Sequence, residues 1–278
     1  MCPILFDFGT VTIFGATIPL RVGGYGLMYA LAVLVGWRLM CWLGRQRYPE
    51  APWTDMYFFS IIGGVLGGRV LNALLRLDDI ARGHVTLLDA LISGGVFLGG
   101  VVVGLVIYIL LMKRHGVEIG YGFNALFVGL PPSHAIGRVG CLLGGCCYGA
   151  PTDLPWGITY HNELAHRLMG TPLGVPLHPT PLYEVGVELL LFAIALRLWF
   201  RRPRPFAIAA VWFVGYGLAR FAIEFVRADY RGGFLFLSTS QWISLGLVAI
   251  GLWWLLGRLG GRLTEPPSPA DRPARRPA

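Results

Sequence analysis

The sequence predicts an all-α polytopic membrane protein with seven transmembrane helices. Hydrophobic residues make up 55% of its 278 residues and charged residues only 14%, and the mean hydropathy is +0.62. Apolar runs of about 20 residues recur along most of the chain, and a helix of that length crosses a hydrocarbon core of about 30 Å. The charged residues gather between these runs, which is typical of a chain that crosses a membrane repeatedly.

Seven apolar runs mark the expected helices in chain order. They cover residues 24–43, 53–77, 89–112, 121–148, 180–200, 206–227 and 239–258. Charged residues follow several of the runs, such as Arg45 and Arg47 after the first, and Lys113 and Arg114 after the third. Pairs of glycines recur inside the runs, and small residues let helix backbones approach closely in a membrane. We therefore expect a bundle of closely packed helices.

Basic residues between the runs give the expected orientation. One alternate set of loops carries twelve of them: Arg45, Arg47, Lys113, Arg114, Arg201, Arg202, Arg204, Arg258, Arg262, Arg272, Arg275 and Arg276. The opposite set carries five: Arg21, Arg76, Arg82, Arg167 and Arg231. Because positively charged loops tend to stay cytoplasmic, we expect the N-terminus outside and the C-terminus in the cytoplasm. Most of the net charge of +8 would then lie on the cytoplasmic face, where anionic lipid headgroups attract it. No nucleic acid is expected as a partner.

The polar segments complete the expected organisation. Residues 1–262 are expected to form one membrane-embedded domain, with an outer loop or cap at about 150–179. The start of the chain lacks the basic and apolar regions of a signal peptide and predicts a short segment on the outer interface. Residues 263–278 are rich in proline and charge, so we expect a disordered cytoplasmic tail.

Three arginines lie within or beside apolar runs: Arg69, Arg138 and Arg220. A charge in hydrocarbon is costly and usually has a function. A guanidinium group presents a planar fork to two oxygens, so these residues suggest an anionic ligand. For Arg220 an alternative is an intrahelical ion pair with Glu224, four residues later.

Cys141, Cys146 and Cys147 form a cluster of thiols in the sequence. Gly144-Gly145 between them permits a broken helix or a tight turn that brings the thiols together. A structural or disulfide role, direct chemistry, and a metal site that includes His134 are the alternatives. The Cys-x4-Cys-Cys spacing differs from the usual zinc motifs, so no metal is expected. No cofactor is expected either.

Several motifs resemble those of the prolipoprotein diacylglyceryl transferases, and they occur in the same order as in that family. They are Pro3-Ile-Leu-Phe-Asp-Phe-Gly9 followed by Tyr25, Gly67-Gly-Arg-Val70, Gly137-Arg138-x-Gly140, His178-Pro-Thr-Pro-Leu-Tyr-Glu184, Tyr216-Gly-x-x-Arg220-Phe-x-x-Glu224-Phe-x-Arg227 and Ser238-Thr-Ser-Gln241. The resemblance covers most of the chain.

The resemblance implies a multi-pass enzyme of the bacterial inner membrane. Such an enzyme moves the diacylglyceryl group of phosphatidylglycerol onto the lipobox cysteine of a prolipoprotein, which forms a thioether and releases glycerol phosphate. The implied partners are therefore phosphatidylglycerol and a prolipoprotein signal peptide with its lipobox cysteine. The reaction requires binding of a phosphodiester, stabilisation of the leaving phosphate and removal of the thiol proton.

The resemblance and the residue chemistry together predict the site. The expected catalytic residues are Arg138, Arg220, Glu224, His178 and Tyr25. The expected substrate-binding residues are Arg138, Arg220, Arg69, Tyr216, Gly149 and Arg227. His134 and His178 are both candidates for proton transfer.

The chain also departs from the family pattern. Cys141 and Cys146 stand where the family has asparagine and glutamate, and Leu98 stands at a functional histidine. Three alternatives therefore stay open. They are a membrane thiol-disulfide redox protein that uses the cysteine cluster, a family relative with a different acceptor, and a noncatalytic lipid-binding bundle.

Overall fold

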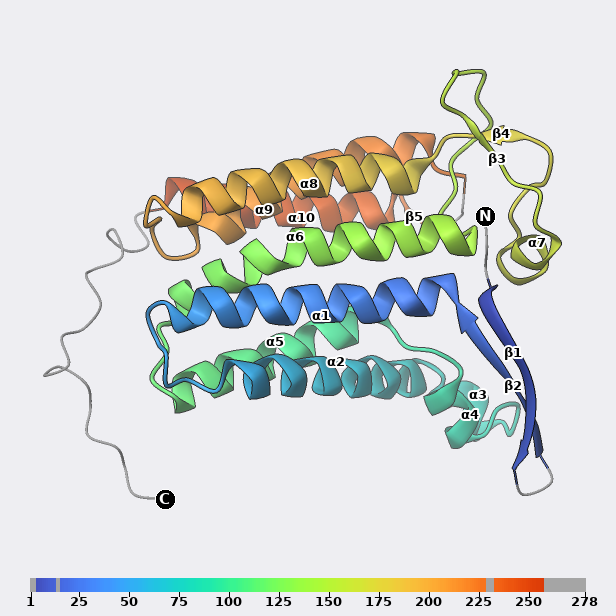
Figure 1. Cartoon of the computed structure of the whole chain (residues 1–278), viewed down its shortest axis with the longest axis horizontal. Helices are drawn as coiled ribbons and strands as arrows, with labels where there is room; N and C mark the ends of the chain where they lie inside the picture. The colour runs from blue at the N-terminus through green and yellow to red at the C-terminus, as the bar shows by residue number, and fades with distance from the viewer. Residues whose placement is uncertain (1–3, 14–15, 229–232, 258–278) are drawn as a thin grey trace, which may run out of the picture. The chain divides into compact units, whose positions relative to one another are not determined.

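A computed structural model describes residues 4–13, 16–228 and 233–257 of the chain. It contains mostly helices together with short two-stranded sheets (Figure 1). The contacts divide the chain into two compact units, one of residues 40–125 and one that combines residues 1–39 with 126–278. The predicted tail at 263–278 lies outside the described residues.

Seven long helices lie at the positions of the seven predicted runs. They are α1 (Gly24–Arg45), α2 (Trp53–Leu75), α5 (Phe97–Arg114), α6 (Ile119–Gly144), α8 (Thr180–Trp199), α9 (Ala207–Ile223) and α10 (Thr239–Leu256). Six of them are long and apolar enough to cross a membrane. The seventh, α8, carries Glu184, Glu188 and Arg197. The all-α polytopic fold is thus confirmed with six candidate spans.

Shorter elements join these helices. They are α3 (Leu77–Ala81), α4 (Leu87–Ile92), α7 (Glu163–Met169), the 3-10 helix η1 (Glu224–Val226), and the strand pairs β3 (Ile158–Thr159) with β4 (Pro176–Leu177) and β5 (Gly233–Phe234) with β6 (Leu237–Ser238). The predicted outer loop at 150–179 thus contains one short helix and one small sheet.

The predicted run at 89–112 is wrong at its start, because the chain breaks between α4 and α5. Thr86 begins α4 with a capping box in which Thr86 and Asp89 exchange hydrogen bonds. The break follows Ile92, and Gly94 adopts a φ of 134° there, which a residue with a Cβ rarely adopts. Only from Phe97 onward is the run one continuous helix.

The N-terminal segment forms a hairpin of β1 (Ile4–Ile13) and β2 (Ala16–Gly23). An exposed ion pair joins its strands, with Arg21 Nε 2.9 Å from Asp7 Oδ2. The backbone N–H of Gly9 and the Arg21 guanidinium both bond to this carboxylate and lower the pKa of Asp7. The sequence alone predicted a short interfacial segment and did not reveal the sheet.

The unit of residues 40–125 packs α2 against α5 through glycines. A Cβ on Gly104 would lie 2.8 Å from the carbonyl oxygen of Ser60, and one on Gly64 would lie 3.0 Å from that of Gly100. The backbones therefore approach each other more closely than side chains would allow, as the repeated glycine pairs predicted. A further contact joins α5 to the start of α6, where the Tyr108 hydroxyl donates a hydrogen bond to the carbonyl of Gly122.

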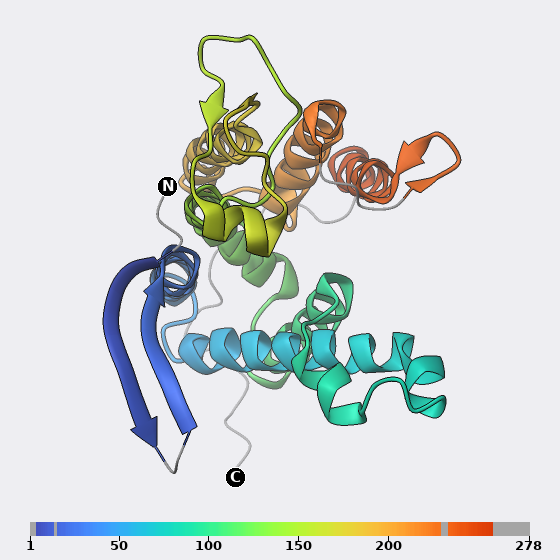
Figure 2. The same cartoon turned by 90° about the vertical axis from the view of Figure 1, so that its right-hand side faces the viewer.

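In the other unit, α9 packs between α8 and α10 (Figure 2). Phe127 of α6 contacts both Trp212 and Phe213 of α9, with ring centroids 5.3 and 5.1 Å apart. A Cβ on Gly217 of α9 would lie 2.9 Å from the carbonyl oxygen of Ser244 on α10. These contacts place α6, α8 and α9 together, and the polar residues of this unit lie among them.

We expect Gly104→Ala to lower the thermal unfolding midpoint in detergent. Its new Cβ would press on the Ser60 carbonyl, and overpacking of this kind costs about 1–3 kcal/mol. The matched control is Gly246→Ala in α10, where no atom lies within 4 Å of the new Cβ. Gly246→Ala should leave the midpoint unchanged or raise it. Equal losses in both variants would contradict the proposed close packing.

Candidate functional site

Arg138 on α6 is held between two partners in the interior of its unit. Its Nε lies 2.8 Å from Oε2 of Glu184 on α8. The same nitrogen donates to Nε2 of His134, one turn earlier on α6, at 3.1 Å. Only 16% of the Arg138 side chain is exposed. The Nε side of the guanidinium is thus fixed by Glu184 and His134, and Nη1 lies on the opposite side.

Glu184 also binds a second arginine. Its Oε1 accepts a hydrogen bond from Nη1 of Arg227 at 3.2 Å, and the side chains of both residues are almost fully buried. One carboxylate therefore bridges Arg138 and Arg227, which the sequence places 89 positions apart. A buried charge is tolerated only when it is paired, so the contacts with Glu184 hold both arginines in their positions.

A second buried carboxylate, Glu188, lies one turn further along α8. Its Oε1 is 2.6 Å from Nδ1 of His134, and its Oε2 accepts from Nε1 of Trp212 at 2.9 Å. Because Arg138 can only donate, His134 Nε2 accepts and His134 Nδ1 carries the proton toward Glu188. Tyr216 stacks on Trp212 with ring centroids 4.6 Å apart and contacts the His134 ring edge-on.

Arg220 on α9 forms the ion pair that the sequence suggested. Its Nη1 lies 2.6 Å from Oε2 of Glu224, and Glu224 Oε1 accepts from the Ser238 hydroxyl at 2.7 Å. Only 7% of the Arg220 side chain is exposed. The ion pair therefore engages Nη1, whereas the buried Nη2 makes no hydrogen bond within the described residues. Buried donors are normally satisfied, which sets Nη2 apart from the other donors of this unit.

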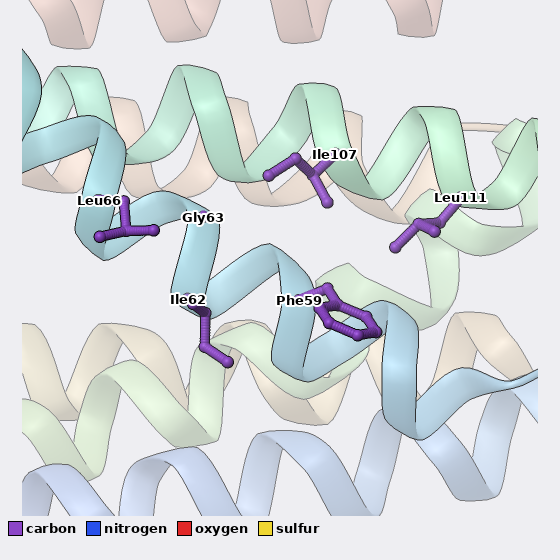
Figure 3. Close-up of a pocket in the computed structure, with 6 residues that line it drawn as sticks. All are labelled: Phe59, Ile62, Gly63, Leu66, Ile107 and Leu111. Carbon is purple, nitrogen blue, oxygen red and sulfur yellow. The ribbon is translucent and has the colours of Figure 1, made fainter.

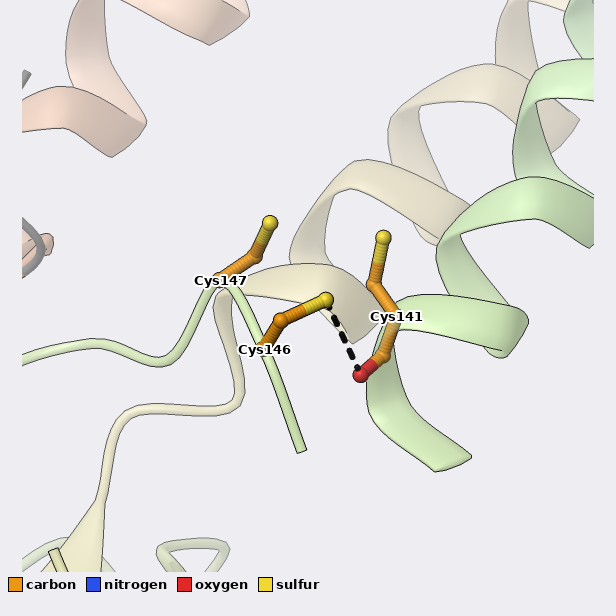
Figure 4. A group of neighbouring side chains, drawn as sticks. All are labelled: Cys141, Cys146 and Cys147. Carbon is orange, nitrogen blue, oxygen red and sulfur yellow. Dashed lines mark hydrogen bonds between the residues drawn. The ribbon is translucent and has the colours of Figure 1, made fainter. Parts of the chain in front are cut away.

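The three clustered cysteines converge where α6 ends. The helix stops at Gly144, and Gly145 turns the chain with a φ of 76°, as the glycine pair had suggested. The turn returns Cys146 and Cys147 toward Cys141, and their sulfur atoms all lie within 4.8 Å of one another (Figure 4). None of the three forms a disulfide within the described residues, and three sulfurs at this spacing can hold one soft metal ion.

The Nη1 side of the Arg138 guanidinium faces this thiol cluster. Its Nη1 lies 3.8 Å from the sulfur of Cys147 and 4.0 Å from that of Cys141. Cys147 adopts a φ of 62°, a left-handed conformation that is uncommon for a residue with a side chain. The Thr180 hydroxyl donates to the Cys147 carbonyl and holds this conformation. Cys141 is buried, whereas Cys146 and Cys147 are half-buried.

Gly149 packs between two segments that carry predicted site residues. Its N–H donates to the carbonyl of His178 at 3.0 Å, and it pairs with Arg227 in an isolated bridge. A Cβ on Gly149 would lie 2.5 Å from His178 Cβ and 2.6 Å from the carbonyl oxygen of Val226. Glycine is therefore required here, because a larger residue would push Arg227 away from Glu184.

Tyr25 and His178 lie at the margin of this arrangement. Tyr25 at the start of α1 is half-exposed, and a Cβ on Gly140 of α6 would lie 3.5 Å from its ring. His178 Nδ1 shares a hydrogen bond with the Tyr183 hydroxyl at 3.0 Å. That hydroxyl also accepts from Nε1 of Trp156 at 2.8 Å. His178 is thus part of a separate aromatic and polar group.

Arg69 and Leu98 belong to the unit of residues 40–125. Arg69 Nη1 donates to the carbonyl of Leu91 at 2.9 Å, at the end of α4. Leu98 lies in the first turn of α5 with 60% of its surface exposed.

A pocket of about 410 Å³ lies on this unit between α2 and α5 (Figure 3). It is lined by Phe59, Ile62, Gly63, Leu66, Ile107 and Leu111. Because these residues bring no polar side chain, the pocket offers no group for binding an anion or moving a proton.

Sequence reasoning did not assign a role to Glu184, Glu188 or Trp212. The two carboxylates are four residues apart in an otherwise apolar run, so they share one face of α8. Ionisable residues within an apolar helix usually face the protein interior and pair there. This local signal could have identified α8 as part of the site.

Comparisons with known proteins point to one family. The family model described as prolipoprotein diacylglyceryl transferase matches residues 12–257. A phosphatidylglycerol–prolipoprotein diacylglyceryl transferase of Clostridium tetani is 32% identical over 256 residues, which cover 91% of this chain and 96% of that protein. Proteins of the same name from Aromatoleum aromaticum and Nitratidesulfovibrio vulgaris are each 35% identical and cover 95% and 87% of this chain, with 96% and 92% of their own lengths.

We expect Glu184→Gln to destabilise the protein strongly. The variant would leave Arg138 and Arg227 buried without their shared carboxylate, and breaking a buried pair costs about 3–5 kcal/mol. The matched control is Glu163→Gln, which removes an exposed pair with Arg167 and should cost about 0.5 kcal/mol or less. Unfolding midpoints in detergent would measure both, and similar midpoints for the two variants would refute the bridging role of Glu184.

Proposed function

Because this chain belongs to the prolipoprotein diacylglyceryl transferase family, we propose that it moves the diacylglyceryl group of phosphatidylglycerol onto a lipobox cysteine of a prolipoprotein. It is a transferase of lipoprotein biosynthesis. The observation that carries the site assignment is Arg220, a buried guanidinium whose Nη1 pairs with Glu224 while its Nη2 makes no hydrogen bond within the described residues.

The proposed reaction is a substitution at carbon. The acceptor sulfur bonds to the glyceryl carbon, the carbon–oxygen bond to phosphate breaks, and glycerol phosphate leaves with the electron pair. Negative charge grows on the departing phosphate, so groups that already point toward it lower the barrier. An arginine fork suits this task, because it stays charged and donates to two oxygens at once.

Arg220 and Arg138 are the proposed phosphate ligands. In support, Arg220 Nη2 makes no hydrogen bond within the described residues, and Arg138 Nη1 faces sulfur, a weak acceptor. Arg227 and Tyr216 are proposed to assist, since Arg227 shares Glu184 with Arg138 and Tyr216 contacts the His134 ring that bonds to Arg138. Arg69 is a further candidate for contact with the headgroup.

The remaining site residues have supporting roles in this proposal. Glu224 orients Arg220 through the ion pair on α9, and Gly149 admits the close packing beside Arg227. The Tyr25 hydroxyl would donate to the lipid headgroup. His178 would receive a proton, with Tyr183 fixing the direction of its ring.

Neither the thiol-disulfide redox alternative nor the noncatalytic alternative is favoured. A thiol-disulfide redox protein would not need the buried arginines and carboxylates, and the family match covers most of the chain. A noncatalytic bundle would not need a buried donor such as Arg220 Nη2, which makes no hydrogen bond within the described residues.

We also propose seven transmembrane helices, with α8 as the additional span, in the bacterial inner membrane. The two carboxylates of α8 are bonded to Arg138, Arg227, His134 and Trp212, which removes most of the cost of placing them in a membrane. Twelve basic residues in one set of loops against five in the other favour the N-terminus outside. Residues 150–179 would then form a cap on the outer side.

The function is tested by reconstitution into vesicles that contain phosphatidylglycerol, together with a lipobox peptide. Mass spectrometry should detect one diacylglyceryl group on the peptide cysteine. Arg220→Lys should slow this transfer by about 10- to 100-fold, because lysine lacks the fork and a hydrogen bond to a charged group contributes about 1.5–3 kcal/mol. Exposed Arg167→Lys is the control. An unmodified peptide would refute the function, and an unimpaired Arg220→Lys variant would refute the phosphate site.

The orientation predicts the behaviour of two reporter fusions. A fluorescent protein that folds only in the cytoplasm should fluoresce when fused after residue 278, because that end is expected inside. A phosphatase that folds only outside the cytoplasm should be active when inserted at the exposed Gly174. Activity in the reverse pattern, or with both fusions on one side, would contradict the seven-span topology.

A further inference from the structure

The thiols of Cys141, Cys146 and Cys147 have no part in the function proposed above, yet they meet at one point beside Arg138. We propose that these three cysteines bind a zinc ion, and that the open fourth coordination position of the zinc takes the acceptor cysteine as a thiolate. The second half of this inference rests on the proposed transferase function, whereas the zinc site itself does not.

The sulfur atoms already lie close to the arrangement that zinc requires. Zinc–sulfur bonds of about 2.3 Å in a tetrahedron place sulfur atoms about 3.8 Å apart. The three sulfurs here lie within 4.8 Å of one another, so shifts of about 1 Å would close the site. Figure 4 shows the side chain of Cys146 between those of Cys141 and Cys147.

The backbone holds the cysteines in this arrangement. The N–H of Cys146 donates to the carbonyl of Cys141 at 3.0 Å, which closes the turn after α6. Cys147 keeps its left-handed φ of 62°, and Thr180 binds its carbonyl. A strained conformation of this kind costs of order 1 kcal/mol and commonly occurs at functional sites. Here it brings the sulfur of Cys147 to the other two.

Arg138 contacts two of the proposed zinc ligands. Its Nη1 lies 3.8 Å from the sulfur of Cys147 and 4.0 Å from that of Cys141, on the side of the guanidinium that Glu184 does not contact. An N–H directed at sulfur favours the thiolate form, which is the form that binds a metal. The cation also offsets part of the negative charge that three thiolates bring.

The ligand set selects the metal. Thiolates favour zinc, copper(I) or iron–sulfur clusters over magnesium and calcium. Three protein ligands with one open position are typical of catalytic zinc, whereas structural zinc has four. Cys146 and Cys147 are only half-buried, so a fourth ligand has room to approach. The sequence argued against zinc because Cys-x4-Cys-Cys differs from the usual zinc spacings, but the turn at Gly145 brings these three sulfurs together despite that spacing.

Zinc in this position would make the acceptor thiol easier to deprotonate. Binding to zinc would favour the thiolate, and the thiol proton would pass to water or to His178, the proton acceptor proposed above. The thiolate would then attack the glyceryl carbon, and the carbon–oxygen bond would break with its electron pair on the phosphate. The thioether formed is neutral and would leave the zinc. No oxidant or reductant is involved.

The test uses the reduced full-length protein in detergent, with zinc and then with cobalt(II) as the probe. We expect one metal ion per chain by elemental analysis, and a thiolate-to-cobalt absorption band in the near ultraviolet. Cys146→Ser and Cys147→Ser should each lower the metal content to near zero. Cys41→Ser is the matched control, because Cys41 contacts Thr54 in the other unit. A chelator followed by zinc should remove and restore the signal in the unaltered protein.

A lipobox peptide then tests the fourth position. Its cysteine should raise the intensity of the cobalt band by about one third, since thiolate ligands increase from three to four, and a peptide with serine should not. Absence of metal, equal metal content in the serine variants, or a disulfide within the cluster would overturn the zinc site.

Transfer in the same preparation separates the two proposals. Lipid transfer by metal-free protein would overturn the zinc inference and leave the transferase function intact. Metal binding with a peptide response but no transfer from phosphatidylglycerol would support the zinc site and contradict the assigned donor.

Discussion

The site depends on one buried carboxylate. Glu184 on α8 contacts Arg138 on α6 and Arg227 after η1, and all three side chains are largely removed from solvent. Neither arginine could stay in the interior without a negative partner. The bridge therefore joins three segments that are distant in the sequence. It also orients Arg138 so that Nη1 faces the thiols of Cys141 and Cys147.

A second line of contacts fixes the orientation of Arg138. Trp212 and His134 both bond to Glu188, and Nε2 of His134 then receives the N–H of Arg138. Tyr216 stacks on Trp212 and covers the imidazole edge. The hydrogen bonds from Trp212 to Glu188, between Glu188 and His134, and from Arg138 to His134 limit the rotamers that Arg138 can adopt. The phosphate ligand proposed here is thus held in position before any substrate arrives.

Much of the architecture could be predicted from the sequence, because apolar runs and glycine pairs are local signals. The runs gave the positions of all seven long helices, and the pair at 144–145 indicated the turn that gathers the cysteines. The break near Gly94 was not predicted, since a run of apolar residues and glycines does not reveal a change in φ. The partners of Arg138 and Arg69 were also missed, because Glu184 and the Leu91 carbonyl become neighbours only after folding.

Arg138 makes contacts of two chemical kinds at once. One planar cation lies against a carboxylate along one edge and against sulfur along another. Because the guanidinium is planar, a rotation that improves its contacts on one edge changes its contacts on the other. If the phosphate binds Arg138 as proposed, its arrival would therefore alter the contact with the sulfurs, and a ligand at the sulfurs would alter phosphate binding to the same extent.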